Sequence, residues 1–200
     1  MRPSRGFHSM HLADADHIVD GALAAARLSG DDLLAALEAL PAPIYVTDAE
    51  GVVTAFNAAC TRFAGREPAA GKDRWCVTWK LYTEAGDALP HERCPMAMAL
   101  QERRTIRGAC AVAERPDGTR VLFVPFPTPF FDEGGELLGA INLLIDVTEA
   151  RQAAELRAQA VRCRRLVAEI TDRQAMSALK ALATQCEAKA AELEGRQAAT

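Results

Sequence analysis

The chain has 200 residues, of which half are apolar and a quarter are charged, and its net charge is −4. This length accommodates one core of ordinary size and an extension, but not two large domains. The acidic balance argues against a nucleic-acid-binding surface, and no apolar run reaches the roughly 18 residues that span a bilayer. Met1–Ser9 is not followed by the apolar stretch of a secretory signal, so we expect a cytoplasmic protein that starts at Met1 or at Met10.

The six cysteines are scattered along the chain, without a CxxC pair and without clustered histidines. This spacing argues against a structural zinc site. In a reducing cytoplasm we expect small buried or half-buried thiols. The cysteines are Cys60, Cys76, Cys94, Cys110, Cys163 and Cys186.

The N-terminal part of the chain shows helical periodicity twice. Apolar residues at helical spacing predict a helix over residues 13–28 and a second, shorter helix that ends before Pro41. Ser29-Gly30 separates the two helices, and Asp31 or Asp32 is positioned to cap the second.

From Ile44 the apolar pattern becomes that of strands. Residues 44–47 and 52–56 predict a hairpin around Gly51, and Asn57 then caps a short helix that ends at Gly65. A less regular segment holds both tryptophans, and the next helix begins at Pro95.

Three further strands are predicted over residues 106–115, 121–126 and 137–145. Pro127 and Pro129 place the far end of the second of these at an edge or outside the sheet. The third is almost entirely apolar, which is typical of a central strand covered by the domain's helices on one face. The N-terminal helix or a partner subunit is expected to cover its other face. The order of elements predicts an α+β domain with an antiparallel sheet.

Several short motifs follow one another along this region. They are Ile44-Tyr45-Val46-Thr47-Asp48 with Gly51, Asn57-Ala58-Ala59 with Gly65-Arg66, Leu89-Pro90 with Cys94-Pro95-Met96-Ala97, Arg115-Pro116-Asp117-Gly118, and Asp146-Val147-Thr148-Glu149. In this order and at these spacings they resemble the PAS domains of bacterial sensor proteins, over roughly residues 31–150.

The resemblance implies a PAS-like five-stranded antiparallel sheet with helices on one face, which cups a small pocket and serves in sensing or protein association. It divides the chain into an N-terminal helical extension (1–30), a PAS domain (31–148) and a C-terminal helical dimerisation or relay segment (149–200). Concave sites between a sheet and its helices are the usual small-molecule sites.

The candidates for lining this pocket are Trp75, Cys76, Trp79, His91, Met98 and Asn142. Asn142 interrupts an apolar strand, and a buried amide must find hydrogen-bond partners. Two interpretations remain open for Asn142: contact with a ligand, or a hydrogen bond to a neighbouring loop or exposure at the strand face.

The sequence requires no cofactor, and we expect neither flavin nor haem. Light-sensing relatives hold flavin with a Gly-Arg-Asn-Cys-Arg-Phe-Leu-Gln-like stretch, whereas Gly71-Lys72-Asp73-Arg74-Trp75-Cys76 displaces the cysteine and lacks the amides. Haem needs an axial ligand, and His91 lies just ahead of the helix that carries one in relatives. A metal or redox cluster of His91 with Cys76 and Cys94 is a minority alternative.

The resemblance implies that the junction at Asp146 and Thr148 passes strain from the sheet to a long helix, which Thr148 is positioned to cap. Two apolar seams with heptad spacing follow. The first consists of Ala153, Leu156, Ala160, Cys163, Val167 and Ile170. The second consists of Met176, Leu179, Ala183, Cys186, Ala190 and Leu193. Thr171 with Gln174 predicts a capping box between the two seams. The seams are out of phase with each other, which favours a helical hairpin or two angled helices over one continuous coiled coil.

The C-terminal helices contain no histidine, and the chain has no glycine-rich nucleotide loop or nucleophile elbow. We therefore expect a protein that is not an enzyme. The leading hypothesis is a sensor or adaptor in which a small-molecule ligand or another signalling protein alters the association of the C-terminal helices within a homodimer. The alternatives are a constitutive dimerisation scaffold without a ligand and a cofactor-bearing haem or redox sensor.

Overall fold

The computed structural model describes residues 15–199, which form two compact units that meet between Asp146 and Val147. The expectations for Met1–Ser9, and for a helix that begins at residue 13, lie outside the described residues. The domain boundaries at residues 30 and 148 stay predictions.

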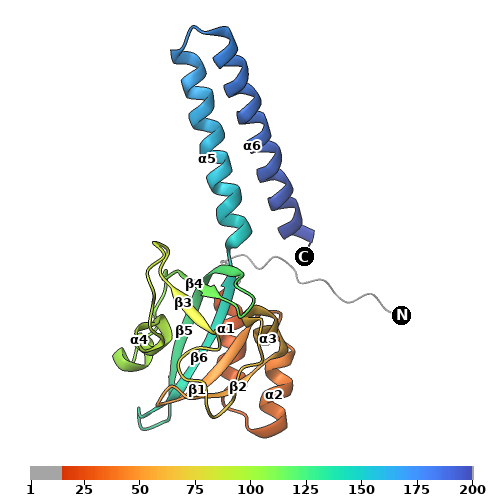
Figure 1. The fold of residues 1–200 in the computed structure, drawn as a ribbon. Coiled ribbons are helices and arrows are strands. Elements are labelled where there is room, and N and C mark those ends of the chain that lie inside the picture. Colours follow the sequence, from red (N-terminus) through yellow and green to blue (C-terminus); the bar gives the residue numbers. More distant parts are fainter. Residues whose placement is uncertain (1–14, 200) are drawn as a thin grey trace, which may run out of the picture. The chain divides into compact units, whose positions relative to one another are not determined.

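The first unit contains a six-stranded antiparallel sheet in the order β2-β1-β6-β5-β4-β3 (Figure 1). Its strands are β1 (Ile44–Asp48), β2 (Val53–Phe56), β3 (Lys80–Tyr82), β4 (Ala111–Glu114), β5 (Arg120–Phe131) and β6 (Leu137–Asp146). The α+β class and the antiparallel sheet are confirmed. The sixth strand, which the sequence did not reveal, is β3, a three-residue edge strand that pairs with β4.

The helices of this unit begin and end largely where local signals place them. They are α1 (Ala15–Ala25), α2 (Gly30–Glu38), α3 (Ala58–Ala64), the 3₁₀ turn η2 (His91–Arg93) and α4 (Pro95–Glu102). Asn57 caps α3 by accepting a hydrogen bond from the Cys60 amide, and Gly65 ends α3 with φ of 64°. The predicted cap of α2 was wrong: Ser29 occupies that position, without a side-chain hydrogen bond.

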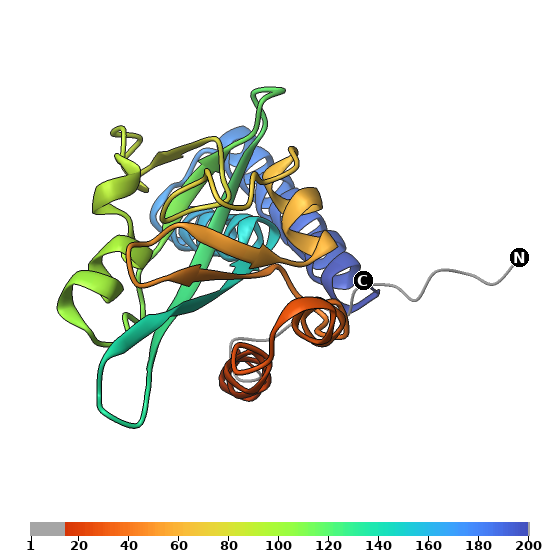
Figure 2. The ribbon, with the colours of Figure 1, turned by 90° about the horizontal axis from the view of Figure 1, so that it is seen from below.

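The core lies between one face of the sheet and the helices α3 and α4. Tyr45, Phe123 and Leu144 project from the strands into one cluster with Phe63 of α3 and Met96 of α4. On the opposite face α1 packs against β5 and β6, and Figure 2 shows α1 and α3 on opposite sides of the sheet. Of the two covers expected for the second face of the last strand, the N-terminal helix is the one that packs there.

The strand β5 is longer than expected because it continues through three prolines. It pairs with β6 as far as Phe131, but with β4 only as far as Phe123. The carbonyl of Pro127 accepts hydrogen bonds from the Ile106 amide and from Arg107, so it points away from β6. Pro125 and Pro129, two residues to either side, point the same way. The nitrogens without hydrogen therefore lie along the edge of β5 that β4 leaves unpaired.

The strand predicted over residues 106–115 was wrong in its first half, since β4 begins only at Ala111. The preceding segment approaches β5 through hydrogen bonds to the Pro127 carbonyl, and Arg107 donates to Thr128 as well as to Pro127. With no donor on Pro127, this stretch of β5 cannot form a regular ladder with a further strand.

The second unit is an antiparallel helical hairpin of α5 (Thr148–Glu169) and α6 (Arg173–Ala199) (Figure 1). The two predicted seams pack against each other within one chain. One cluster combines Ala160, Cys163, Ala183 and Cys186 with Leu156 and Leu179. A second cluster combines Ala153, Ala190, Leu193 and Leu156. Of the two arrangements left open by the sequence, the structure has the hairpin.

Both predicted caps in this unit were wrong by one residue. The Asp172 carboxylate, not the Thr171 hydroxyl, accepts the hydrogen bond of the Ala175 amide at the start of α6. Thr148 is the first residue of α5, with Val147 in the cap position. No helix among residues 15–199 is long and apolar enough to cross a membrane.

Candidate functional site

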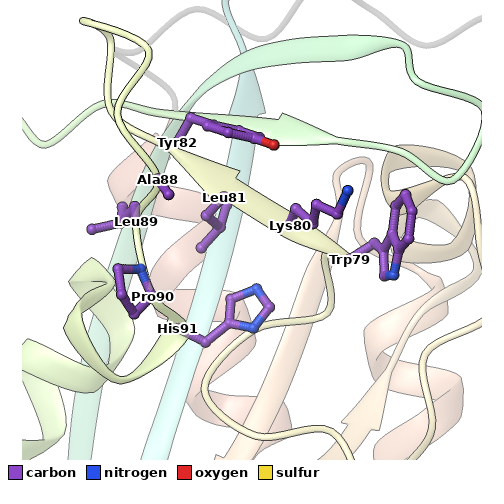
Figure 3. A pocket seen from close by; sticks show the side chains of 8 residues that line it. All are labelled: Trp79, Lys80, Leu81, Tyr82, Ala88, Leu89, Pro90 and His91. Carbon is purple, nitrogen blue, oxygen red and sulfur yellow. The ribbon is translucent and has the colours of Figure 1, made fainter.

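A shallow surface pocket of about 260 Å³ lies where β3 meets the segment that leads into α4. The turn over 83–87 closes when the Thr83 amide donates to the Asp87 carbonyl, and the Leu89 amide then donates to the Leu81 carbonyl. This turn brings 88–91 alongside β3. Figure 3 shows Leu81 pointing from β3 toward Pro90 and His91, with Trp79 at the far end of the pocket. The lining residues are Trp79, Lys80, Leu81, Tyr82, Ala88, Leu89, Pro90 and His91.

A chain of polar contacts runs from this pocket into the core. His91 Nε2 lies 3.5 Å from the Thr78 hydroxyl, which lies 3.1 Å from Cys76 Sγ. Because Thr78 and Cys76 are buried, these polar atoms depend on one another for hydrogen bonds.

A second set of polar contacts surrounds Tyr45, which lies in the same core cluster as Cys76. Its hydroxyl donates to the Trp75 carbonyl at 2.8 Å and accepts from the Asn142 side-chain amide at 2.9 Å. The Asn142 side-chain oxygen in turn accepts from the Phe126 amide at 2.9 Å. We call these two hydrogen-bonded sets together the polar chain, because Cys76 and Tyr45 lie in one core cluster. It consists of His91, Thr78, Cys76, Tyr45 and Asn142.

The environment of His91 favours the neutral imidazole. Burial lowers the pKa of His91, the Arg66 guanidinium lowers it further, and the carboxylates of Glu92 and Asp73 oppose these effects. Arg66 is held in place by an ion pair with Asp73 at 2.6 Å and by a hydrogen bond to the Thr78 carbonyl at 3.4 Å.

The core cysteines are protonated thiols. Burial raises the pKa of Cys76 and of Cys60, and it raises that of Cys94 to about 12. Burial likewise raises the pKa of the Tyr45 hydroxyl well above its ordinary value. Thiols of this kind are poor nucleophiles and poor metal ligands, because both roles need the thiolate.

The structure brings most of the predicted pocket residues together, but not in one cavity. Trp79 and His91 line the pocket, Cys76 and Asn142 belong to the polar chain, and Trp75 contributes its backbone carbonyl. The Asn142 side chain is 2% exposed and bonds to Tyr45 of β1 and the Phe126 amide of β5, so its partners lie on the neighbouring strands and not on a loop.

The prediction for Met98 was wrong. The helix α4 turns Met96 and Leu100 into the core, where they are 1% and 6% exposed, whereas Met98 is 38% exposed. Residues two apart on a helix face nearly opposite directions, so Met98 lies away from the core.

Sequence reasoning missed Tyr45 and Thr78, which belong to the polar chain. Tyr45 was placed on the correct strand, but Ile44 to Thr47 are all buried, so no alternation along β1 assigns Tyr45 to one face. Thr78 lies in the irregular segment between Trp75 and Trp79, where no periodic signal indicates which way a side chain points.

In the described part of the chain, no three His, Cys, Asp or Glu side chains gather closely enough to hold a metal ion. The site therefore offers an open apolar pocket with one imidazole and one ammonium group at its wall, and a buried polar chain behind it.

The sequence profile of the PAS fold family matches residues 37–152. The chain belongs to the PAS family. Its PAS domain is a sensory signalling module, which agrees with the resemblance read from the motifs. No curated protein sequence matches the chain.

Solved structures similar to this PAS protein come from several organisms. The PAS domain of the fruit-fly ELK potassium channel is 12% identical, over 54% of this chain and 87% of that one, with a TM-score of 0.44. A PAS domain from Colwellia psychrerythraea is 16% identical, over 57% and 93% of the two chains, with a TM-score of 0.39. The Rhodobacter sphaeroides LOV protein is 15% identical, over 92% and 98%, with a TM-score of 0.44.

Proposed function

We propose that this PAS protein is a non-enzymatic sensor or adaptor that converts occupancy of its PAS domain into a change in the association of the α5–α6 hairpin. The occupant is a small molecule or another signalling protein, and the association is that of a homodimer. The observation that carries the proposal is the connection through β6. Asn142 at the centre of this strand bonds to Tyr45, and β6 ends at Asp146 with only Val147 before α5 begins.

The surface pocket is the place where an occupant would first meet the polar chain. His91 lines the pocket and also contacts Thr78, so a group bound to the imidazole competes with or reinforces that contact. A ligand shifts a conformational equilibrium only by its difference in affinity between the two states. The His91–Thr78 contact supplies such a difference, because an occupant of the imidazole binds one state of this contact more tightly than the other.

The hairpin has a face suited to association with a second copy. Ion pairs Arg157–Glu194 and Arg164–Glu187 cross between the helices at 2.5 and 2.6 Å and mark one side of the hairpin. At 100° per residue, Leu166 lies about 160° around α5 from Arg164, and Leu182 lies about 140° around α6 from Glu187. Leu166 and Leu182 are 41% and 38% exposed, so an apolar surface remains on the side away from these ion pairs.

The test is the oligomeric state of Leu166→Glu, measured by sedimentation velocity at micromolar concentrations. We expect a dimer for the unmodified chain and at least a tenfold weaker dimer for Leu166→Glu, because an uncompensated charge would be buried at the interface. Val161→Glu is the matched control, since Val161 is 68% exposed and lies about 140° around the same helix. A monomeric unmodified chain, or equal weakening by both variants, would contradict the proposal.

A constitutive scaffold is the second candidate, and the filled core favours it. Tyr45, Met96, Phe123 and Leu144 are each at most 2% exposed and occupy the space between the sheet and the helices. In this case native mass spectrometry of the protein from its own cells would show a dimer without a bound small molecule. A small molecule that is bound to the unmodified protein but absent from His91→Ala would favour the sensor instead.

A further inference from the structure

Two cysteines meet in the seam of the helical hairpin. Cys163 of α5 and Cys186 of α6 belong to one buried cluster with Ala160 and Ala183, and they are 6% and 5% exposed. Both carry free thiols in this structure. Each cysteine lies on a different helix, so the packing of the two helices is what brings the thiols together.

The ion pair between Arg164 and Glu187 fixes the register of the helices at this point. Its guanidinium and carboxylate lie 2.6 Å apart, and each partner is the residue that follows one of the two cysteines. A second ion pair, Arg157 with Glu194 at 2.5 Å, repeats the match one heptad earlier on α5 and one heptad later on α6. The two cysteines are therefore held near the same level of the hairpin.

Small neighbours let the two helices approach closely around the cysteines. Ala160 and Ala183 are 1% and 0% exposed, so no large side chain separates the backbones in this part of the seam. Helices that pack through small side chains have axes about 8 Å apart, and Cα atoms lie about 2.3 Å from each axis. Facing Cα atoms of such a seam come within the separation of about 4.4–6.8 Å that a disulfide spans.

We propose that Cys163 and Cys186 form a reversible disulfide when the protein meets hydrogen peroxide, and that this cross-link holds α5 against α6. One thiolate attacks a peroxide oxygen, the O–O bond breaks, and a sulfenic acid forms with release of water. The second thiolate then attacks the sulfenic sulfur, and the hydroxyl group leaves as a second water. The two thiols lose two electrons and two protons in total, which reduce the peroxide. Exchange with a small thiol such as glutathione restores both cysteines.

The cysteines of the first unit lie in different surroundings. Burial raises the pKa of Cys60, Cys76 and Cys94, so these core thiols stay protonated and react poorly with peroxide. Cys110 is half-buried and lies in the first unit, away from the seam. The hairpin pair lies in a unit of two helices, where local parting of the helices opens both thiols to solvent together.

The cross-link would act on the part of the chain to which we assign the output. A disulfide in the seam keeps α5 and α6 paired within one chain, so it excludes any dimer in which the helices exchange partners between copies. This consequence rests on the proposed function, whereas the formation of the disulfide does not.

Treatment of the reduced full chain with stoichiometric hydrogen peroxide tests the disulfide directly. We expect the mass of one chain to fall by two hydrogens, peptide mapping to join the segments that carry Cys163 and Cys186, and dithiothreitol to reverse both changes. Denaturing electrophoresis without reductant should show no cross-linked dimer. The oxidised chain should melt at least about 5 °C above the reduced chain in circular dichroism, because the cross-link restricts the unfolded hairpin.

Single variants separate this pair from the other thiols. Cys163→Ala and Cys186→Ala should each abolish the cross-link and the rise in melting temperature, and they should fold, since alanine already occupies neighbouring positions of the seam. Cys110→Ala is the matched control and should keep both effects. Helical circular-dichroism spectra confirm that each variant is folded.

An unchanged mass after peroxide treatment would overturn the proposal, as would a disulfide between two copies or a cross-link that survives in Cys163→Ala. Leu166→Glu distinguishes this result from the fate of the proposed function. If the disulfide forms as described but Leu166→Glu is as dimeric as the unmodified chain, the cross-link stands and the assignment of the hairpin as the output fails.

Discussion

The side-chain amide of Asn142 donates a hydrogen bond to the Tyr45 hydroxyl at 2.9 Å, between residues 97 positions apart in the sequence. The two residues are register partners on the neighbouring strands β6 and β1. A polar pair at this place fixes the strands through side chains as well as through the backbone. It also makes the centre of the sheet sensitive to the hydrogen bonds of Tyr45.

Replacement of Asn142 by leucine should lower the free energy of unfolding by about 1–3 kcal/mol, because the Phe126 amide and the Tyr45 oxygen lose a buried partner. Urea unfolding followed by circular dichroism measures the loss. Thr54→Val removes a side-chain hydrogen bond to the Val46 carbonyl at an exposed position and should cost less than about 0.5 kcal/mol. Equal losses for the two variants would show that the Asn142 bonds contribute no special stability.

Gly139 should not tolerate even a methyl group. A Cβ atom there would overlap the Thr47 carbonyl oxygen, inside the pairing of β6 with β1. Gly139→Ala should therefore destabilise the first unit by upwards of about 3 kcal/mol, seen as a lower urea midpoint. Gly195→Ala is the control, because nothing lies within 4 Å of its added Cβ and alanine is the better helix former. A Gly139→Ala variant with an unchanged midpoint would refute the close approach.

The small residues of the hairpin should be necessary for its close packing. Ala183 is fully buried between α5 and α6, so Ala183→Leu should cost about 1–3 kcal/mol through overpacking. Ala178→Leu places the same side chain at an exposed position of α6 and should be close to neutral. Thermal unfolding of the full chain, followed by the circular-dichroism signal of the helices, compares the two variants. A larger loss for Ala178→Leu would mean that the helices pair through another face.

Acid should weaken the fold through His91. Because burial and Arg66 lower the pKa of His91 in the folded chain, the unfolded chain binds the proton more tightly. The stability that the neutral imidazole contributes is fully present above about pH 6.5 and is lost as the pH falls below that value. Urea unfolding at a series of pH values should show a shallower acid slope for His91→Gln than for the unmodified chain. Identical slopes would contradict the lowered pKa.

Local signals in the sequence predicted the parts of the fold that depend on a few neighbouring residues. Asn57 caps α3, Gly65 ends it in a left-handed conformation, and Pro95 occupies the first turn of α4, each as expected. These positions are set by backbone geometry that adjacent residues determine. The caps of α5 and α6 were missed by one residue, because Thr171 and Asp172 are both suitable caps and only the entry geometry selects between them.

The candidate site was less predictable, because its connections join distant segments. His91 and Asn142 stand out by residue type, but nothing in the sequence relates either of them to Tyr45 or Thr78. The contact between Thr78 and His91 arises because the turn over 83–87 folds the chain back on β3, a strand too short to show periodicity. Met98 shows the reverse case, in which a suitable residue type on the correct helix lies on the wrong face.

The three prolines of β5 restrict how copies of this protein can join. Along the edge beyond Phe123, Pro125, Pro127 and Pro129 present carbonyl oxygens but no amide hydrogens. An approaching strand would find half of the ladder missing, so a continuous intermolecular sheet cannot grow from this side. The Pro127 carbonyl already accepts hydrogen bonds from Ile106 and Arg107, and residues 125–129 are buried. This edge is therefore protected from fibrous aggregation, and helical surfaces are the safer means of self-association.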